Sequence, residues 1–395
     1  MKKLTHSLLG FIACALLLGS CNPMDFPSRL TAVLLNEHSL SVDGGSSFSL
    51  YITATPKRYT SGDITVTWES SKPQVVTVSE TGNLEALKAG FATIKVTVVS
   101  KDVTLKDSCE VMITSGDIYF ADPAFEAFCV SEFDANDDGA VSTDEAAGVQ
   151  RINCPELNIA SLEGIEFFPS LTNLLCQENN ISSLNLSYNP NLVYLNCSEN
   201  AISSLDLSYN PNLDYITCND NDLVSLNLEG NSKLEFLSCR NNELTSLDVS
   251  SCGLLEYLMC IENNISSIDL THNPVLAYMS CQNCNMTSLD ISKNTALLYL
   301  TCGYNPLTQL DLSNNTKLEF LFCRSNSLTA LDLSNNTVIS EVNCRDNSLT
   351  TLDVSNNLVL RKLDCSENPA LAELWIKTGY FMNLTKDYAT EIKYK

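Results

Sequence analysis

The stretch LVYLNCSENAISSLDLSYNPN, residues 192–212, decides the fold of this chain. Its pattern, L-x-x-L-x-C-x-x-N-x-L-x-x-L-D-L-S-x-N-x-x, recurs every 21 residues, and an irregular first unit of 22 residues begins at Val149. The regular units begin at Leu171, Leu192, Leu213, Leu234, Leu255, Leu276, Leu297, Leu318, Ile339 and Leu360. One unit is too short to bury its own apolar positions, so the repetition predicts stacked coils that share one core.

This pattern is identified as the leucine-rich repeat, which implies a mostly β solenoid over residues 149–380. In each unit the L-x-x-L-x-C segment is expected to form a short strand. The strands of the eleven units should then make a parallel sheet on the concave side. The last regular unit slips by one residue after Asn368, and residues 381–395 are expected to form a C-terminal cap over the last coil.

Cysteine occupies slot six of every unit and is expected to point into the core beside the leucines. The column comprises Cys154, Cys176, Cys197, Cys218, Cys239, Cys260, Cys281, Cys302, Cys323, Cys344 and Cys365. Neighbouring strands lie ~4.8 Å apart, whereas disulfides prefer a Cβ separation of about 3.8 Å, so free thiols are predicted. Cys281 and Cys284 form a C-x-x-C string that is typical of redox or zinc sites. The register favours packing instead, because Cys284 stands in the slot that Asn holds in other units.

Two polar columns follow from the same register. Asn at slot nine, as in Asn263 and Asn305, is expected to turn inward and satisfy backbone groups where the chain leaves the strand. Asp at slot fifteen recurs from Asp206 to Asp353 and places like charges about 5 Å apart. Either local hydrogen bonds or counterions must compensate this repulsion.

Slot three lies on the exposed face of the predicted sheet, because slots four and six point inward. Seven consecutive units carry an aromatic residue there: Tyr194, Tyr215, Phe236, Tyr257, Tyr278, Tyr299 and Phe320. These rings either form a ligand-binding strip for sugars or protein contacts, or stack on each other and stabilise the sheet. Arg240, Arg324 and Arg345 at slot seven would add hydrogen bonds to a glycan or an acidic group.

Residues 134–145, DANDDGAVSTDE, match the twelve-residue EF-hand calcium loop. The candidate ligands are Asp134, Asn136, Asp138, the carbonyl of Ala140, Ser142 and Glu145. Gly139 at position six permits the sharp turn, and hard oxygen ligands suit one structural calcium ion rather than zinc. The alternative is an acidic turn that binds nothing. The loop lies within residues 119–148, which are expected to form an EF-hand-like helical cap before the repeats.

Residues 31–114 show apolar residues alternating with polar ones, as in ITVTWESS at 64–71, punctuated by turn residues. Several short strands in such a segment indicate a β-sandwich. This string, together with KAGFATI at 88–94, resembles the group 2 bacterial immunoglobulin-like domain. The resemblance implies a spacer or adhesion module on a cell surface, with Trp68 in its core.

The N-terminus is typical of a targeting segment. Residues 1–20 contain two early lysines and then an apolar run that is too short to span a hydrocarbon core of ~30 Å. The small residues before Cys21 resemble the lipobox of bacterial lipoproteins, in which this Cys carries the lipid. An ordinary signal peptide that is cleaved elsewhere is the alternative. Residues 21–30 are interpreted as a linker.

Composition narrows the function further. The chain has 47 Asp and Glu against 23 Lys and Arg, a net charge of -24 that repels phosphate backbones and argues against nucleic acid as a partner. It contains only 3 His and no H-E-x-x-H, G-x-S-x-G or P-loop motif, so an enzyme is not expected.

The 21-residue unit with its cysteine column resembles the cysteine-ladder branch of the internalin-type leucine-rich repeat proteins. The whole arrangement is similar to surface lipoproteins of Bacteroidetes. The resemblance implies a non-catalytic adhesin or binding protein, anchored in the outer membrane and exposed at the surface. Its concave face would recognise a protein or glycan on a host or microbial surface. The alternative is a glycan-capture lipoprotein of a polysaccharide-uptake system.

Overall fold

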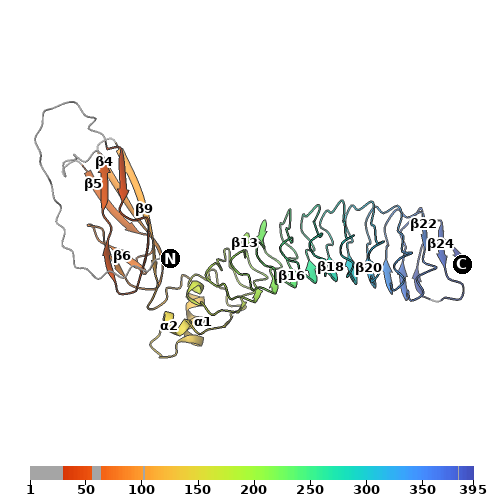
Figure 1. Ribbon diagram of the computed structural model, residues 1–395, viewed down its shortest axis with the longest axis horizontal. Coiled ribbons are helices and arrows are strands. Elements are labelled where there is room, and N and C mark those ends of the chain that lie inside the picture. Colours follow the sequence, from red (N-terminus) through yellow and green to blue (C-terminus); the bar gives the residue numbers. More distant parts are fainter. Residues whose placement is uncertain (1–29, 56–63, 101–102, 381) are drawn as a thin grey trace, which may run out of the picture.

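The computed structural model describes residues 30–55, 64–100, 103–380 and 382–395. They form a β-sandwich, a short helical segment and a long solenoid, in that order (Figure 1). The predicted signal peptide and Cys21 lie outside the described residues. None of the helices in the described part of the chain has the length and apolar character that a membrane span requires.

The first domain is a sandwich whose strands pair antiparallel, except that β2 pairs with β9 in parallel. Its strands are β1 (Ala32–Leu35), β2 (Ser39–Val42), β3 (Ser47–Ser49), β4 (Ile52–Thr55), β5 (Ile64–Ser70), β6 (Val76–Val78), β7 (Asn83–Ala86), β8 (Gly90–Ser100) and β9 (Val103–Ile113). One sheet has the order β2-β9-β8-β5, a second has the order β3-β7-β6, and β1 pairs with β4. Ile94, Val96 and Val98 of β8 are fully buried, and Trp68 packs against this core. The predicted β-sandwich is confirmed.

Two helices stand between the sandwich and the solenoid (Figure 1). They are α1 (Pro123–Phe133), which Asp122 caps at its N-terminus, and α2 (Thr143–Ala146), which begins with a capping box. Phe133 of α1 meets Phe168 of the first coils edge to face, with 5.8 Å between the ring centroids. The helical segment therefore packs on apolar side chains at the start of the solenoid.

Each coil of the solenoid contributes one short strand to a parallel sheet of twelve strands. In order they are β10 (Arg151–Asn153), β11 (Asn173–Leu175), β12 (Tyr194–Asn196), β14 (Tyr215–Thr217), β16 (Phe236–Ser238), β17 (Tyr257–Met259), β18 (Tyr278–Ser280), β19 (Tyr299–Thr301), β20 (Phe320–Phe322), β21 (Glu341–Asn343), β23 (Lys362–Asp364) and β25 (Asn383–Thr385). Elsewhere on the coils lie η1 (Ile165–Phe167), β13 (Ser204–Asp206), β15 (Ser225–Asn227), β22 (Thr351–Asp353), β24 (Glu373–Ile376) and β26 (Glu391–Tyr394). The twelve strands stay in step, because each slot pairs with the same slot of the next coil.

The C-terminal end corrects one prediction. The sequence predicts eleven strands and a separate cap over residues 381–395, but β25 within that segment is a twelfth strand. Asn383 pairs with Lys362, which stands 21 residues earlier, so the chain regains the repeat spacing after its slip. On another side of the coil, β26 pairs with β24. The segment that the sequence predicts to cap the solenoid therefore covers the preceding coil as a further coil of the same kind.

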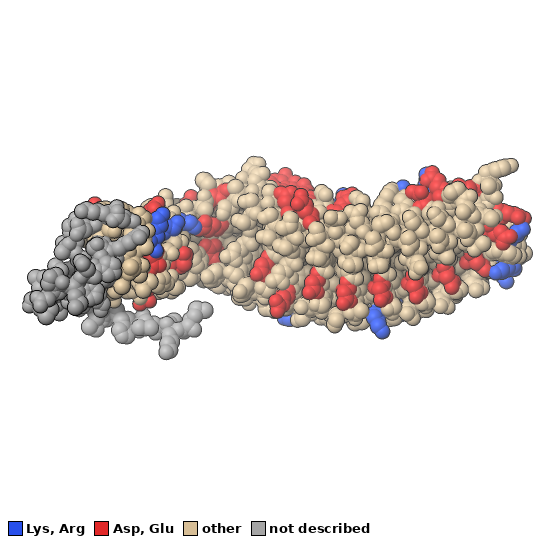
Figure 2. Space-filling view, turned by 90° about the horizontal axis from the view of Figure 1, so that it is seen from above, with Lys and Arg blue, Asp and Glu red and all other residues tan. Residues whose placement is uncertain are grey.

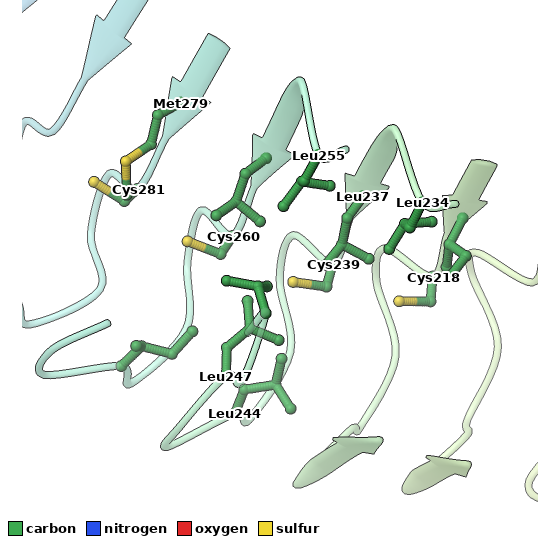
Figure 3. Packing of buried hydrophobic residues seen from close by; sticks show 14 of the residues in the cluster. Cys218, Leu234, Leu237, Cys239, Leu244, Leu247, Leu255, Cys260, Met279 and Cys281 are labelled. Carbon is green, nitrogen blue, oxygen red and sulfur yellow. The ribbon is translucent and has the colours of Figure 1, made fainter. Parts of the chain in front are cut away.

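The solenoid interior consists of leucine and cysteine columns (Figure 3). All fifteen described cysteines are buried thiols, and none of them forms a disulfide in the structure. Several thiols donate to a carbonyl of the next coil, as Cys218 does to Ser238 at 3.5 Å. Burial raises the pKa of the Cys197 and Cys239 thiols to about 12, so both stay protonated at neutral pH. The column packs as a set of small apolar side chains.

Asparagine at slot nine fastens each coil to its neighbours, as predicted. The Nδ2 of Asn305 donates to the carbonyls of Cys281 and Cys302 at 2.9 and 3.0 Å. Its Oδ1 accepts the backbone N–H groups of Cys284 and Met286 at 3.1 and 2.9 Å. One side chain thus satisfies backbone groups of two coils at the point where the chain leaves the strand.

Cys284 takes the place of this asparagine in its own coil. Its thiol donates to the carbonyls of Cys260 and Gln282, with Sγ–O distances of 2.9 and 3.4 Å. These acceptors correspond by register to those of the asparagines in the other coils. The structure thus agrees with the interpretation that Cys284 belongs to the packing register.

Backbone pairing joins the sandwich to the helical segment, and side chains join it to the solenoid. The Ala89 N–H of the sandwich donates to the Asp117 carbonyl at 2.7 Å, and the Ile118 N–H donates to the Val141 carbonyl at 2.8 Å. Phe91 of β8 also contacts Tyr188 of the solenoid, with 5.3 Å between ring centroids. Residues 117–118, which follow β9, are therefore held between the sandwich and the loop that joins α1 to α2.

Candidate functional site

The outer face of the twelve-stranded sheet carries the predicted aromatic column. All seven aromatic residues stand at the first position of their strands, pair in register, and are half-buried. Each is followed by a buried residue that points into the core. The column continues without an aromatic side chain at Glu341 and Lys362, which form an ion pair at 2.6 Å.

The rings stack on each other in groups. Tyr194, Tyr215 and Phe236 lie almost parallel, with 4.5 and 4.2 Å between successive centroids, and Tyr257 stacks on Tyr278 at 4.4 Å. Phe236 and Tyr257 are 5.9 Å apart and tilted by 34°, and Tyr278 and Tyr299 are 6.3 Å apart. Stacking therefore stabilises the sheet. Ring edges and the breaks between groups remain for a ligand.

The arginines on one flank of the column are engaged by the chain itself. Arg240 pairs with Glu262 at 3.5 Å, and Arg345 pairs with Glu367. The guanidinium of Arg324 lies over the Tyr304 ring, 4.7 Å from its centroid. The three arginines thus spend on the chain itself much of the charge and hydrogen bonding that the sequence analysis expects them to offer a ligand.

The other flank carries acids that the sequence analysis missed. Slot two, directly before the aromatic residue, holds Asp214, Glu235, Glu256 and Glu319 in four of the coils. The last three are exposed, and none of the four lies within 4.0 Å of a Lys, Arg or His nitrogen among the described residues. The sequence does contain this information, because aligning the units at 21-residue spacing places these acids in one column. Lys233 lines the same groove as Asp214 and Glu235, and its Nζ donates to the Asn212 Oδ1 at 2.7 Å. This flank of the face is therefore mainly acidic.

The predicted calcium ligands lie on the loop between α1 and α2, except Glu145, which lies in the first turn of α2. Asp134 accepts the Gly139 N–H at 2.8 Å, and Glu145 accepts the Ser142 N–H and hydroxyl, both at 2.8 Å. The hydrogen bonds from Ser142 lower the pKa of the Glu145 carboxyl. The donors are all oxygens, as calcium prefers. No three His, Cys, Asp or Glu side chains of the described chain gather closely enough to hold a metal, so an ion would have to draw the ligands together.

The aspartate column at slot fifteen is compensated by local hydrogen bonds. Asp290 accepts the Ser292 N–H at 2.9 Å, and Asp311 accepts the Ser313 N–H at 2.9 Å, with the same arrangement in the neighbouring coils. These bonds lower the pKa of both carboxyls. Figure 2 shows acidic side chains spaced in a row along the solenoid. Of the two possibilities that the sequence leaves open, local hydrogen bonding is the one that the structure displays.

Comparisons with known proteins agree with this architecture. Residues 30–111 match the family of bacterial Ig-like domains, group 2. Internalin J of Listeria monocytogenes serotype 4b (strain F2365) is 36% identical over 71 residues, which are 18% of this chain and 8% of internalin J. The chain therefore aligns with only a small part of that relative's length.

Solved structures extend the likeness over the solenoid. The functional domain of InlJ from Listeria monocytogenes, described as including a cysteine ladder, superposes with a TM-score of 0.54 and 29% identity. That match covers 69% of this chain and 70% of that one. An internalin, InlF, from Listeria monocytogenes str. 4b F2365 gives a TM-score of 0.44 at 17% identity over 69% of this chain and 96% of that one. The chain thus combines an Ig-like domain with an internalin-like solenoid that has a cysteine ladder.

Proposed function

We propose that the chain is a non-catalytic, surface-anchored adhesin that binds a protein partner on the outer face of its twelve-stranded sheet. The observation that carries this proposal is the row of seven half-buried aromatic residues on that face. Rigid aromatic side chains supply much of the binding energy at protein interfaces. The likeness to the functional domain of InlJ supports a surface-binding role.

A glycan partner is the second candidate, and with it a glycan-capture role in polysaccharide uptake. Sugar rings stack on open aromatic faces, whereas Tyr215 lies between two parallel rings and Tyr257 stacks on Tyr278 with one face. The stacked groups therefore offer ring edges rather than a continuous row of open faces, which suits a polypeptide better. A glycan array run beside a protein pulldown would separate the two classes of partner.

The test replaces Tyr257, Tyr278 and Tyr299 together by Ser and measures adhesion of cells that carry the protein. Adhesion should fall strongly, because these rings occupy the middle of the face. The matched control replaces three tyrosines that are more than half exposed elsewhere, Tyr209, Tyr388 and Tyr394. A folded triple variant that adheres as well as this control would remove the aromatic column from consideration.

We also propose that the loop of residues 134–145 binds one structural calcium ion. Asp134, Asn136, Asp138, Ser142 and Glu145 would supply side-chain oxygens and Ala140 its carbonyl, in the order of the EF-hand loop. Calorimetry should show calcium binding to the native chain and none to an Asp134→Ala, Glu145→Gln variant. Absence of heat and of any thermal shift at millimolar calcium would refute this site.

Surface attachment through Cys21 is proposed on the sequence alone. Lipidation of this residue would place the protein in the outer membrane, with the sandwich acting as a spacer. A Cys21→Ala variant should leave the membrane fraction and appear in the soluble one. Retention of that variant in the membrane would contradict lipidation at Cys21.

A further inference from the structure

We propose that the sheet face receives a cationic side chain, lysine or arginine, at the break in the aromatic column between Phe236 and Tyr257. This inference rests on the proposed function and names the chemistry of the partner. The partner would be a protein segment rich in basic residues. Three observations at this break carry the proposal: the ring geometry, the adjacent carboxylates, and the lack of a basic partner within 4.0 Å of either carboxylate among the described residues.

The ring geometry separates this position from the stacked pairs. Tyr299 and Phe320 show a similar break, at 5.9 Å and 39°, but only the break between Phe236 and Tyr257 has a glutamate directly before each of its two rings. Tyr215 and Phe236 are parallel within 5°, and Tyr257 and Tyr278 within 6°, so each of these pairs covers its own inner faces. Phe236 and Tyr257 sit on paired positions of adjacent strands, as the stacked pairs do. Their rings are nevertheless 5.9 Å apart and tilted by 34°. The break therefore leaves aromatic face uncovered in the middle of the column.

The carboxylates lie beside this break. Glu235 precedes Phe236 and Glu256 precedes Tyr257, and the Glu256 N–H donates to the Glu235 carbonyl at 2.9 Å, so the two acids stand on neighbouring coils. Both side chains are exposed. Asp214 continues the column on the preceding coil, since the Glu235 N–H donates to the Asp214 carbonyl at 2.9 Å. Strands ~4.8 Å apart bring these charges within mutual repulsion, which a bound cation would relieve.

The one lysine near this position, Lys233, lines a groove with Asp214 and Glu235, but its Nζ donates to the Asn212 Oδ1 at 2.7 Å on the preceding coil. Arg240, on the opposite flank of the same coil, pairs with Glu262 at 3.5 Å, and Glu235 and Glu256 have no basic partner within 4.0 Å among the described residues. The acids also do not gather into a metal-holding group of three. An aromatic face beside two carboxylates suits an ammonium or guanidinium group, which is attracted to the ring and donates hydrogen bonds to the carboxylates.

The test uses the full chain and titrates it calorimetrically with a lysine-rich peptide and with the same peptide acetylated at every Nε, at physiological ionic strength. Glu235→Gln, Glu256→Gln should weaken binding of the lysine peptide by roughly tenfold or more. The matched control, Glu229→Gln, Glu243→Gln, removes the same charge from exposed acids off the face and should change the affinity less than about twofold. The acetylated peptide should not bind.

Three results would overturn the proposal: equal weakening by the two pairs of substitutions, equal affinity for the acetylated peptide, or no binding of the lysine peptide. Adhesion separates this inference from the proposed function. Adhesion that survives Glu235→Gln, Glu256→Gln but is lost when the three tyrosines are replaced would keep the function and reject the cationic site. The opposite result would reject the proposed function and keep the cationic site: the lysine peptide binds through the two glutamates, but replacing the three tyrosines leaves adhesion unchanged.

Discussion

Single polar side chains satisfy the buried backbone groups at the junction between neighbouring coils. Asn305 satisfies backbone groups on two coils that would otherwise be buried without partners. Leucine could fill the same volume but would leave those donors and acceptors unpaired, at about 1–3 kcal/mol for each buried group. The natural thiol of Cys284 shows that a small side chain with one weak donor is tolerated once in the stack.

This comparison gives a prediction at the residue scale. Asn305→Ala should lower the free energy of unfolding by about 3 kcal/mol, because backbone groups of two coils lose their partner. Asn305→Cys should lower it less, since the thiol keeps a donor. Urea denaturation followed by circular dichroism measures both changes. An alanine variant as stable as the cysteine variant would show that the asparagine hydrogen bonds contribute little.

At the scale of structural elements, the aspartate column at slot fifteen makes the stability of the solenoid depend on pH. Hydrogen bonds from Ser292 and Ser313 lower the pKa of Asp290 and Asp311 below the ordinary 3.8. A lowered pKa in the folded state adds stability that is present above pH 3.8 and is lost as the pH falls below it. Asp290→Asn, Asp311→Asn keeps the acceptor oxygens but removes the titration. Unfolding midpoints from pH 7 to below 3.8 should therefore fall less steeply for this variant, and parallel profiles would contradict the link.

The proposed calcium loop and residues 116–118, which follow the sandwich, are coupled through the backbone. The Ile118 N–H donates to the Val141 carbonyl, and the Thr143 N–H donates to the Gly116 carbonyl at 2.9 Å. Calcium in the proposed site should therefore slow hydrogen exchange at Ile118 and Thr143, while amides of β8 in the sandwich serve as the control. Equal exchange with calcium and with chelator, in a chain that calorimetry shows to bind calcium, would mean that the ion does not stiffen this connection.

Across the whole molecule, the repeat spacing makes most of the fold predictable. The period of 21 residues assigns the inward leucines and cysteines, the asparagine bonds and the exposed aromatic column. It misses β25, because a one-residue slip and the lack of a slot-six cysteine hide the last coil. The repeat spacing also does not predict the left-handed backbone at slot eight, where Glu262 and Ser325 have φ angles of 55° and 54°. Glycine, the residue that usually marks such a conformation, is absent from these two positions.

The candidate site is less predictable for a physical reason. The positions of Phe236 and Tyr257 follow from the register, but the choice between stacking and splaying depends on side-chain rotation. The engagement of Arg240 by Glu262 depends likewise on a contact between adjacent coils. Sequence spacing places such groups near each other but does not say which of them interact.

The parallel register of the strands has a mechanical consequence. Hydrogen bonds between neighbouring coils, such as that from the Cys260 N–H to the Ser280 carbonyl at 2.9 Å, run from coil to coil along the solenoid. A pull along this axis loads each interface in series, so the coils should peel away one after another. Each coil of 21 residues would release about 70 Å of extended chain. Single-molecule extension should record repeated steps of this size, which would let a tethered adhesin lengthen under flow and dissipate load before its bound partner is torn away.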